Sequence, residues 1–198
     1  MPHIVKLVIL DRDGTINADS DEYIKSPDEW EPLPGSLEAI ARLNHAGWHV
    51  VVASNQSGLG RGLFDVASLN AIHMKMHKAV AAQGGRIDAV FYCPHSPDDH
   101  CHCRKPQPGL FEQIGERYGI ALAGVAATGD SVRDLQAAAA AGCDPHLVLT
   151  GKGAVWRHQV GAGQPLPAEF PPGTVVHEDL AAFASFLLAR EARQKQAA

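Results

Sequence analysis

Short apolar runs alternate along the chain with segments of helical periodicity. The runs that we predict as strands cover 4–10, 48–53, 89–92, 125–128 and 146–149, and helices are predicted over 36–45, 66–83, 110–118, 131–141 and 180–193. Strands that alternate with helices form parallel sheets. The pattern therefore predicts an α/β fold, with a Rossmann-like parallel sheet and helices on both faces.

Glycine, proline and capping residues mark where these elements begin and end. Ser36 is expected to cap the helix over 36–45, and Gly47 to end it. The segment 151–173 is rich in Gly and Pro and is predicted to be a loop, partly anchored by Val155 and Trp156. Residues 1–193 are expected to form a single domain, and residues 194–198 to fray as a terminal tail.

Histidines and methionines gather in the helix predicted over 66–83, which suggests a ligand cluster at first sight. The residues at helical spacing along one stripe are Ile72, Met76 and Val80. A stripe with a period of 3.6 residues is typical of core packing. We therefore predict that these side chains are buried, and that His73, Met74 and His77 need no ligand to explain them.

Composition and charge narrow the classes of partner. The chain has 198 residues, of which 45% are hydrophobic, enough for one sizeable core. It carries 17 basic and 22 acidic residues, a net charge of −5, without a long Lys/Arg run. This balance argues against a nucleic-acid or membrane surface as the main partner. No targeting or membrane-spanning segment is recognised, so we expect a cytoplasmic protein, and we expect a monomer.

Two carboxylates directly follow the first apolar run. Asp11 and Asp13 would lie at the carboxyl end of a buried strand, with Gly14 allowing a sharp turn. A calcium loop is excluded because its sixth position, which requires glycine, is Ile16. Two carboxylates at this spacing can take different roles in phosphoryl transfer. One attacks phosphorus or binds a metal, and the other transfers a proton.

Later strand ends supply the other groups that phosphoryl transfer requires. Ser54 ends the second predicted strand, Lys105 lies beyond the third and Asp130 follows the fourth. Because the carboxyl ends of parallel strands share one edge, we expect these side chains to converge. They provide a hydroxyl donor, a fixed cation and a further carboxylate for a metal.

This ordered set resembles the haloacid dehalogenase superfamily, whose first motif Asp-x-Asp-x-Thr/Val matches residues 11–15. The resemblance covers about residues 4–150. It implies that Asp11 attacks phosphorus, that Asp13 is the general acid and base, and that Ser54 and Lys105 hold the phosphoryl oxygens. It also implies Mg²⁺ bound by the Asp11 and Asp130 carboxylates and the Asp13 backbone carbonyl. Asp134 is expected to support this site rather than bind the metal. Short connections after Gly14 and Gly109 leave no room for a large cap domain.

A cluster of cysteine and histidine predicts a second metal. The motif Cys-x-His-x5-Cys-x-Cys provides the number and kind of ligands that close a structural Zn²⁺ site. The predicted ligands are Cys93, His95, Cys101 and Cys103, with His100 and His102 as rivals. Such a zinc-stapled loop would brace the segment that carries Arg104 and Lys105. Cys143 stands apart and is expected to be a small buried hydrophobe.

A zinc loop running into Cys-Arg-Lys-Pro is similar to a branch of the superfamily that holds heptose bisphosphate phosphatases and histidinol phosphatases. Residues 55–58, 61–62, 104–109 and 150–152 resemble the heptose enzymes, whereas the five-residue zinc spacer and Ser131 after Asp130 are closer to the histidinol enzymes. The heptose reading implies a phosphorylated sugar bound by Asp19, Ser20, Asp21, Glu22, Asn55, Gln56, Ser57 and Arg104. Arg61 is equally well explained as a solvated cation. An alternative of another class, a zinc-stapled nucleic-acid-binding module, leaves the three aspartates unexplained.

Overall fold

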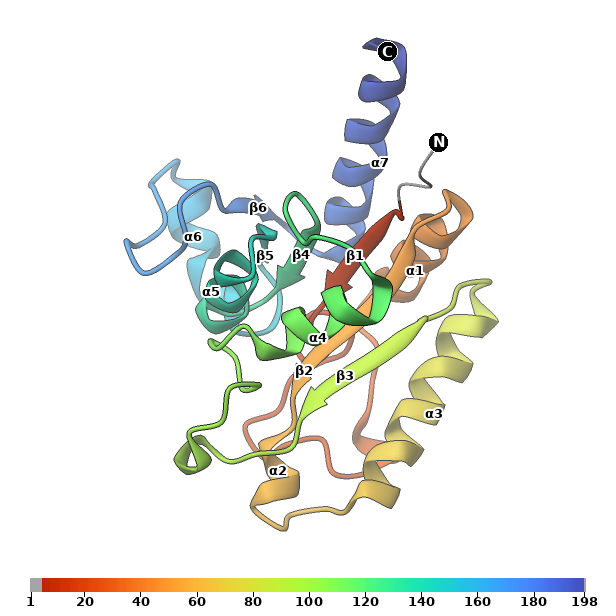
Figure 1. The fold of residues 1–198 in the computed structure, drawn as a ribbon, viewed down its shortest axis with the longest axis vertical. Coiled ribbons are helices and arrows are strands. Elements are labelled where there is room, and N and C mark those ends of the chain that lie inside the picture. Colours follow the sequence, from red (N-terminus) through yellow and green to blue (C-terminus); the bar gives the residue numbers. More distant parts are fainter. Residues whose placement is uncertain (1–4, 198) are drawn as a thin grey trace.

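Six parallel strands form one sheet across residues 5–197, the part of the chain that the computed structural model describes (Figure 1). Their spatial order is β3-β2-β1-β4-β5-β6, and every neighbouring pair is parallel. The strands are β1 Leu7–Leu10, β2 His49–Asn55, β3 Ala89–Cys93, β4 Ala126–Gly129, β5 Asp144–Val148 and β6 Val175–His177. The predicted parallel sheet is confirmed, while the edge strand β6 was not predicted.

Side chains of β1 alternate between two cores. Val8 and Leu10 join the core on one face of the sheet, and Leu7 and Ile9 join the core on the other. All four are at most 2% exposed. A strand buried on both faces reads as a continuous apolar run, which is why the sequence predicts its location so clearly.

Helices cover both faces of the sheet, as predicted (Figure 1). One face carries α1 Ser36–His45, α3 Val66–Ala82 and α7 Leu180–Ala197, and the other carries α4 Gly109–Tyr118 and α5 Val132–Ala140. The short helices are α2 Ser57–Gly60 and α6 Arg157–Gly161, with 3-10 turns η1 Pro27–Glu29, η2 Pro97–Asp99 and η3 Gly151–Trp156.

The predicted stripe of α3 is buried in the core. Ile72, Met76 and Val80 are fully buried, while Met74 is 58% exposed. Core packing therefore explains Met76, whereas Met74 lies on the solvated face of the helix. His73 is buried as well.

The segment 151–173 is not simply a loop, because it contains η3 and α6. The expectation for Trp156 holds: its ring packs edge-on against Phe170, with centroids 5.5 Å apart. The expectation for Val155 is wrong, since this side chain is 73% exposed. Local Gly and Pro content predicted a break from regular structure but not the short turns that pack against Phe170.

Several predicted boundaries differ from the structure. Gly35, at φ 75°, takes the position before α1, and the Ser36 hydroxyl instead donates to the Ile16 carbonyl oxygen at 2.7 Å. Helix α7 continues to Ala197, beyond its predicted end at residue 193; Ala198, the last residue of the expected tail, lies outside the described residues. The first predicted strand begins at Leu7, and its expected first residue, Ile4, also lies outside them.

Strands β1 and β4 are neighbours although two strands separate them in the chain. The connections from β1 and β4 therefore leave in opposite directions along the sheet. Open α/β sheets bind ligands at such a switch point, beside the carboxyl ends of the strands. The fold thus brings the residues after Leu10 next to those after Gly129. Across residues 5–197, no helix has the length and hydropathy needed to cross a bilayer.

Candidate active site

A pocket of about 350 Å³ opens at the carboxyl ends of the strands. Strand β1 supplies Asp11 and Asp13, β2 leads into residues 54–57, and β4 leads into Asp130. Lys105 enters from the loop between β3 and α4. The other lining residues are Asp19, Ser20, Asp21, Tyr23, Ile24, Arg61, Pro97, Arg104, Ser131, Arg133, Asp134 and Lys152. The structure therefore brings together the side chains that the sequence placed at separate strand ends.

Lys105 is a buried cation between two carboxylates. Its Nζ lies 2.8 Å from Asp11 Oδ1 and 2.6 Å from Asp134 Oδ1, and donates to the Ala53 carbonyl at 2.8 Å. Burial alone would lower the pKa of Lys105, but the facing charges of Asp11 and Asp134 outweigh it and raise the pKa. Lys105 is therefore a permanently charged, fixed donor at the base of the pocket.

Asn55 holds the backbone on either side of the Lys105 α-carbon. Its side-chain Oδ1 accepts from the Lys105 N–H, and its Nδ2 donates to the Lys105 carbonyl, both at 3.1 Å. Asn55 was expected to bind substrate. It lines the pocket, but its amide already has partners, so its visible role is to fix Lys105.

Three carboxylates lie close together beside this lysine. Oxygen atoms of Asp11, Asp130 and Asp134 lie within 4.8 Å of one another. Burial and the nearby charge of Asp134 raise the pKa of Asp11 to about 7, and the same two causes raise the pKa of Asp130 to about 8. Hard carboxylate oxygens at this spacing are the donor set that Mg²⁺ prefers. A divalent cation would remove the repulsion that raises these pKa values.

Asp134 has partners that limit its use as a metal ligand. Its Oδ2 accepts from the Ser131 hydroxyl at 2.6 Å and from the Ser131 N–H at 3.0 Å, which caps α5. Its Oδ1 faces Lys105. Burial alone would raise the pKa of Asp134, but Lys105 holds it below its usual range. This geometry favours the supporting role predicted for Asp134.

Two glycines allow the backbone to pass close to Asp130. A Cβ on Gly14 would lie 2.0 Å from Asp130 Oδ2, and a Cβ on Gly151 would lie 2.1 Å from it. Both glycines have positive φ, 79° and 50°, a region that favours glycine. The Asp130 carboxylate also accepts from the Lys152 N–H at 2.7 Å.

Asp13 has surroundings unlike those of Asp11. Its carboxylate accepts hydrogen bonds from Arg12, Asn17 and Gln56, at 2.9 to 3.0 Å. Burial alone would raise the pKa of Asp13, but the Arg12 guanidinium and these hydrogen bonds hold it below its usual range. The sequence motif did not point to Arg12 or Asn17. Arg12 stands at a position that the motif leaves open, and Asn17 lies outside the motif.

The residues after β2 lie at the pocket wall. Ser54 is buried, and its hydroxyl oxygen accepts from Gln56 Nε2 at 2.7 Å. Ser57 begins α2 and also lines the pocket. The predicted hydroxyl donor Ser54 thus lies beside Asp13 and its hydrogen-bond partners, although its oxygen is already used by an amide.

The acidic segment after β1 reaches the pocket only in part. Asp19, Ser20 and Asp21 line it, whereas Glu22 does not. Asp19 forms an ion pair with Lys152, a pocket residue within the segment 150–152 that resembles the heptose enzymes but that was not expected to bind substrate. Arg133, Tyr23, Ile24 and Pro97 were also missed, because no motif marked them. Arg61 and Arg104 do line the pocket.

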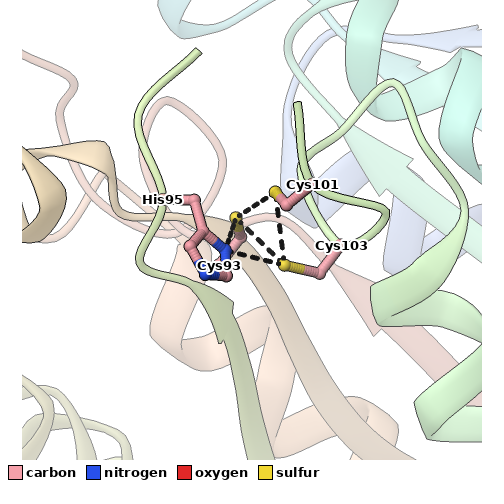
Figure 2. Close-up of side chains that lie close together, drawn as sticks. All are labelled: Cys93, His95, Cys101 and Cys103. Atoms are coloured by element: carbon pink, nitrogen blue, oxygen red, sulfur yellow. Dashed lines mark hydrogen bonds between the residues drawn. The ribbon is translucent and has the colours of Figure 1, made fainter. Parts of the chain in front are cut away.

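The cysteine and histidine residues form a compact cluster (Figure 2). The Sγ atoms of Cys93, Cys101 and Cys103 lie 3.2 to 3.6 Å apart, and His95 Nδ1 lies 3.2 Å from Cys103 Sγ. Tetrahedral Zn–S bonds of about 2.3 Å correspond to sulfur separations of roughly 3.7 Å. No disulfide links the four cysteines of the described chain. The four atoms point toward one centre, as a tetrahedral site requires.

The rival histidines lie outside this cluster. His102 Nε2 contacts Glu112 at 2.6 Å, and the structure does not group His100 or His102 with the four converging ligands. Cys143, by contrast, is buried in the core, as predicted.

Two family models match the chain. One, described as polynucleotide kinase 3 phosphatase, matches residues 6–130, and another, described as HAD-hydrolase-like, matches residues 102–182. The first match covers more than half of the chain and includes the whole set Asp11, Asp13, Ser54, Lys105 and Asp130.

Curated relatives are similar over nearly their whole length. The D-glycero-β-D-manno-heptose-1,7-bisphosphate 7-phosphatase of Bordetella bronchiseptica is 61% identical, over 93% of this chain and 98% of the relative. The protein of that name from Pseudomonas aeruginosa is 56% identical, over 92% and 97%. A crystal structure of the B. bronchiseptica D,D-heptose 1,7-bisphosphate phosphatase, complexed with magnesium and phosphate, matches with a TM-score of 0.86 over 94% of this chain and 99% of that one.

The raised pKa values of Asp11 and Asp130 predict that Mg²⁺ binding strengthens as pH rises. Below about 7 to 8 these carboxyls hold protons that a metal ion must displace. Each displaced proton contributes about a tenfold change in affinity per pH unit. Titration calorimetry at pH 6, 7 and 8 should show tighter binding at each step. Asp130→Asn should weaken binding and flatten this dependence, and equal affinity at pH 6 and 8 would contradict the prediction.

Proposed function

The chain belongs to the D-glycero-β-D-manno-heptose-1,7-bisphosphate 7-phosphatase family of haloacid dehalogenase-like hydrolases, and on that premise we propose that it hydrolyses the 7-phosphate of this sugar bisphosphate. The observation that carries the proposal is the buried Lys105 ammonium beside the Asp11 carboxylate, in a pocket that also holds Asp13 and Asp130. The product enters the supply of heptose for nucleotide-activated sugars and the lipopolysaccharide core.

Asp11 is the proposed nucleophile. One of its oxygens attacks phosphorus and forms an aspartyl phosphate, which water then hydrolyses. Lys105 and Ser54 hold the phosphoryl oxygens, and Lys105 also keeps the side chain of Asp11 oriented at 2.8 Å. Asp11, Asp130 and the Asp13 backbone carbonyl would hold Mg²⁺, whose positive charge would offset the repulsion between a carboxylate and a phosphate.

Asp13 is the proposed general acid and base. It protonates the sugar oxygen as that oxygen leaves, and it takes a proton from the water that hydrolyses the aspartyl phosphate. The different surroundings of Asp11 and Asp13 support this division, since one carboxyl faces Lys105 and two carboxylates while the other is bound by a guanidinium. Carboxyls with distinct environments can take distinct roles.

Cations at the pocket wall support a bisphosphate over histidinol phosphate. Arg61, Arg104 and Arg133 line the pocket, and within residues 5–197 none of the three is ion-paired with a carboxylate. Arginine suits bidentate recognition of phosphate. Histidinol phosphate presents an amine and an imidazole in place of a second phosphate, and unpaired arginines would repel the protonated amine.

The Cys93, His95, Cys101 and Cys103 cluster is proposed to hold Zn²⁺. Four ligands fill a tetrahedral shell and leave no position for a substrate. Cys103 is two residues before Lys105, so the ion braces the loop that carries this lysine. Thiolate ligands need a reducing compartment, which supports a cytoplasmic location. We further propose that residues 1–193 act as one domain, as a monomer that binds no nucleic acid.

The first prediction tests the nucleophile. Asp11→Asn should abolish phosphate release from D-glycero-β-D-manno-heptose 1,7-bisphosphate, because an amide cannot attack phosphorus as a carboxylate does. Asp28→Asn, at an exposed position outside the pocket, is the matched control and should keep the wild-type rate. Phosphate release and circular dichroism of both variants are the measurements. Near wild-type turnover in a folded Asp11→Asn protein would remove Asp11 from this role.

The second prediction concerns the substrate. The wild-type kcat/KM should be higher for the heptose bisphosphate than for histidinol phosphate. Arg104→Ala should lower kcat/KM for the bisphosphate more than for heptose 7-phosphate, because binding of a remote group helps to orient the reacting one. Arg117→Ala, on the exposed side of α4, is the control. Equal losses for the two sugar phosphates would show that Arg104 does not contact the second phosphate.

The third prediction concerns zinc. Elemental analysis of protein purified without chelator should find one Zn²⁺ per chain. Cys101→Ser should lower the zinc content, the melting temperature and the activity, because loss of the ion frees the loop that carries Lys105. His102→Ala should keep its zinc, since His102 lies outside the cluster. Zinc-free wild-type protein, or zinc lost equally from both variants, would refute this ligand set.

A further inference from the structure

Four N–H groups surround the Asp13 carboxylate. Oδ1 accepts from Arg12 Nε and Asn17 Nδ2, and Oδ2 accepts from Arg12 Nη2 at 2.9 Å and Gln56 Nε2 at 3.0 Å. An ionised carboxylate has about four acceptor positions, so these donors fill all of them. A proton or a substrate oxygen can reach Asp13 only when one donor withdraws.

The pocket shows which donor can withdraw. Gln56 lines the pocket and contacts Oδ2. Arg12 and Asn17 are not among the described residues that line it. An incoming leaving-group oxygen therefore meets Oδ2 from the side of Gln56, while the guanidinium stays behind the carboxylate. The Arg12 contact is the one that persists through the reaction.

Arg12 is itself held by a residue of α3. Its side chain is only 1% exposed, so its N–H groups need protein acceptors. Nη2 also contacts Gln56 Oε1 at 3.2 Å, and Nη1 lies 3.4 Å from His73 Nε2. Because arginine has no acceptor, His73 Nε2 must accept. Burial and the charge of Arg12 lower the pKa of His73 to about 4, so the ring is neutral and able to accept.

We propose that Arg12, braced by His73, is a positioning residue that holds the Asp13 carboxyl with Oδ2 toward the leaving-group oxygen. This inference rests on the proposed function. An oxygen of Asp11 forms a bond to phosphorus while the bond from phosphorus to the sugar oxygen breaks. The electron pair of that bond stays on the sugar oxygen, which takes a proton from Asp13 Oδ2; Asp13 must first bind this proton from solvent, at the position that Gln56 vacates. His73, which lies in α3 and does not line the pocket, thereby acts on the steps in which Asp13 gives or takes a proton.

Leaving-group dependence separates this role from a structural one. A sugar alkoxide needs the proton, whereas p-nitrophenolate is a good leaving group and needs it little. Since kcat/KM reports steps up to phosphoryl transfer, His73→Leu should lower it about tenfold for the heptose bisphosphate, part of the roughly 10² to 10⁴ that proton transfer contributes. For p-nitrophenyl phosphate it should stay within about twofold. Arg12→Lys should show the same selectivity with a larger loss.

Two further variants and a melting curve complete the test. His73→Gln places an amide oxygen near the position of Nε2 and should restore most of the lost kcat/KM. His77→Leu, exposed on the same helix, should match the wild type for both substrates. Equal losses for both substrates, or His73→Gln as impaired as His73→Leu, would overturn the proposal. If Arg12→Lys melts below the assay temperature, the His73 pair alone decides. Wild-type protein that hydrolyses neither ester would overturn the proposed function itself, and this inference with it.

Discussion

The Lys105 ammonium group, enclosed between Asp11 and Asp134, is the interaction on which the active site depends. A buried cation is costly unless charge and hydrogen bonds compensate it, and here two carboxylates and the Ala53 carbonyl do so. These partners come from β1, β2 and α5, so one side chain ties three elements together. Asp11 and Asp134 would repel each other without it. Asn55 adds to this arrangement, because its side-chain amide hydrogen-bonds the N–H and the carbonyl of Lys105.

The two carboxyls of the first motif lie close together yet have opposite electrostatic surroundings. Asp11 shares its site with Asp130 and Asp134, and burial together with the nearby charge of Asp134 raises its pKa. Asp13 is bound by the Arg12 guanidinium, which lowers its pKa. The surroundings of Asp11 suit the binding of a metal cation. The surroundings of Asp13 suit a carboxyl that stays fixed in place while it exchanges a proton.

The loop after β3 links the proposed structural metal to the catalytic cation. Cys93 ends β3 in the core, while Cys101 and Cys103 return the chain toward the pocket just before Lys105. The 3-10 turn η2 within this loop contains no buried residue that would fix it. Four metal ligands can supply that rigidity. With a metal bound there, the proposed cluster would help to fix the positions of Arg104 and Lys105 without itself contacting substrate.

Local pattern was sufficient to predict five strands, the major helices and the carboxylates at the strand ends, because residues buried on both faces form unmistakable apolar runs. It also identified the four Cys and His residues that the structure brings together as a possible metal site. Strand β6 was missed because it has only three residues, too few to show a pattern. Four residues were given no role for a different reason: Arg12, Asn17, Arg133 and Lys152. Glu22, which was expected to bind substrate, does not line the pocket, for the same reason. A sequence pattern indicates which side of its own helix or strand a residue occupies. Contacts such as that of Arg12 with His73 depend instead on how elements far apart in the chain pack together. Only the tertiary structure decides that packing.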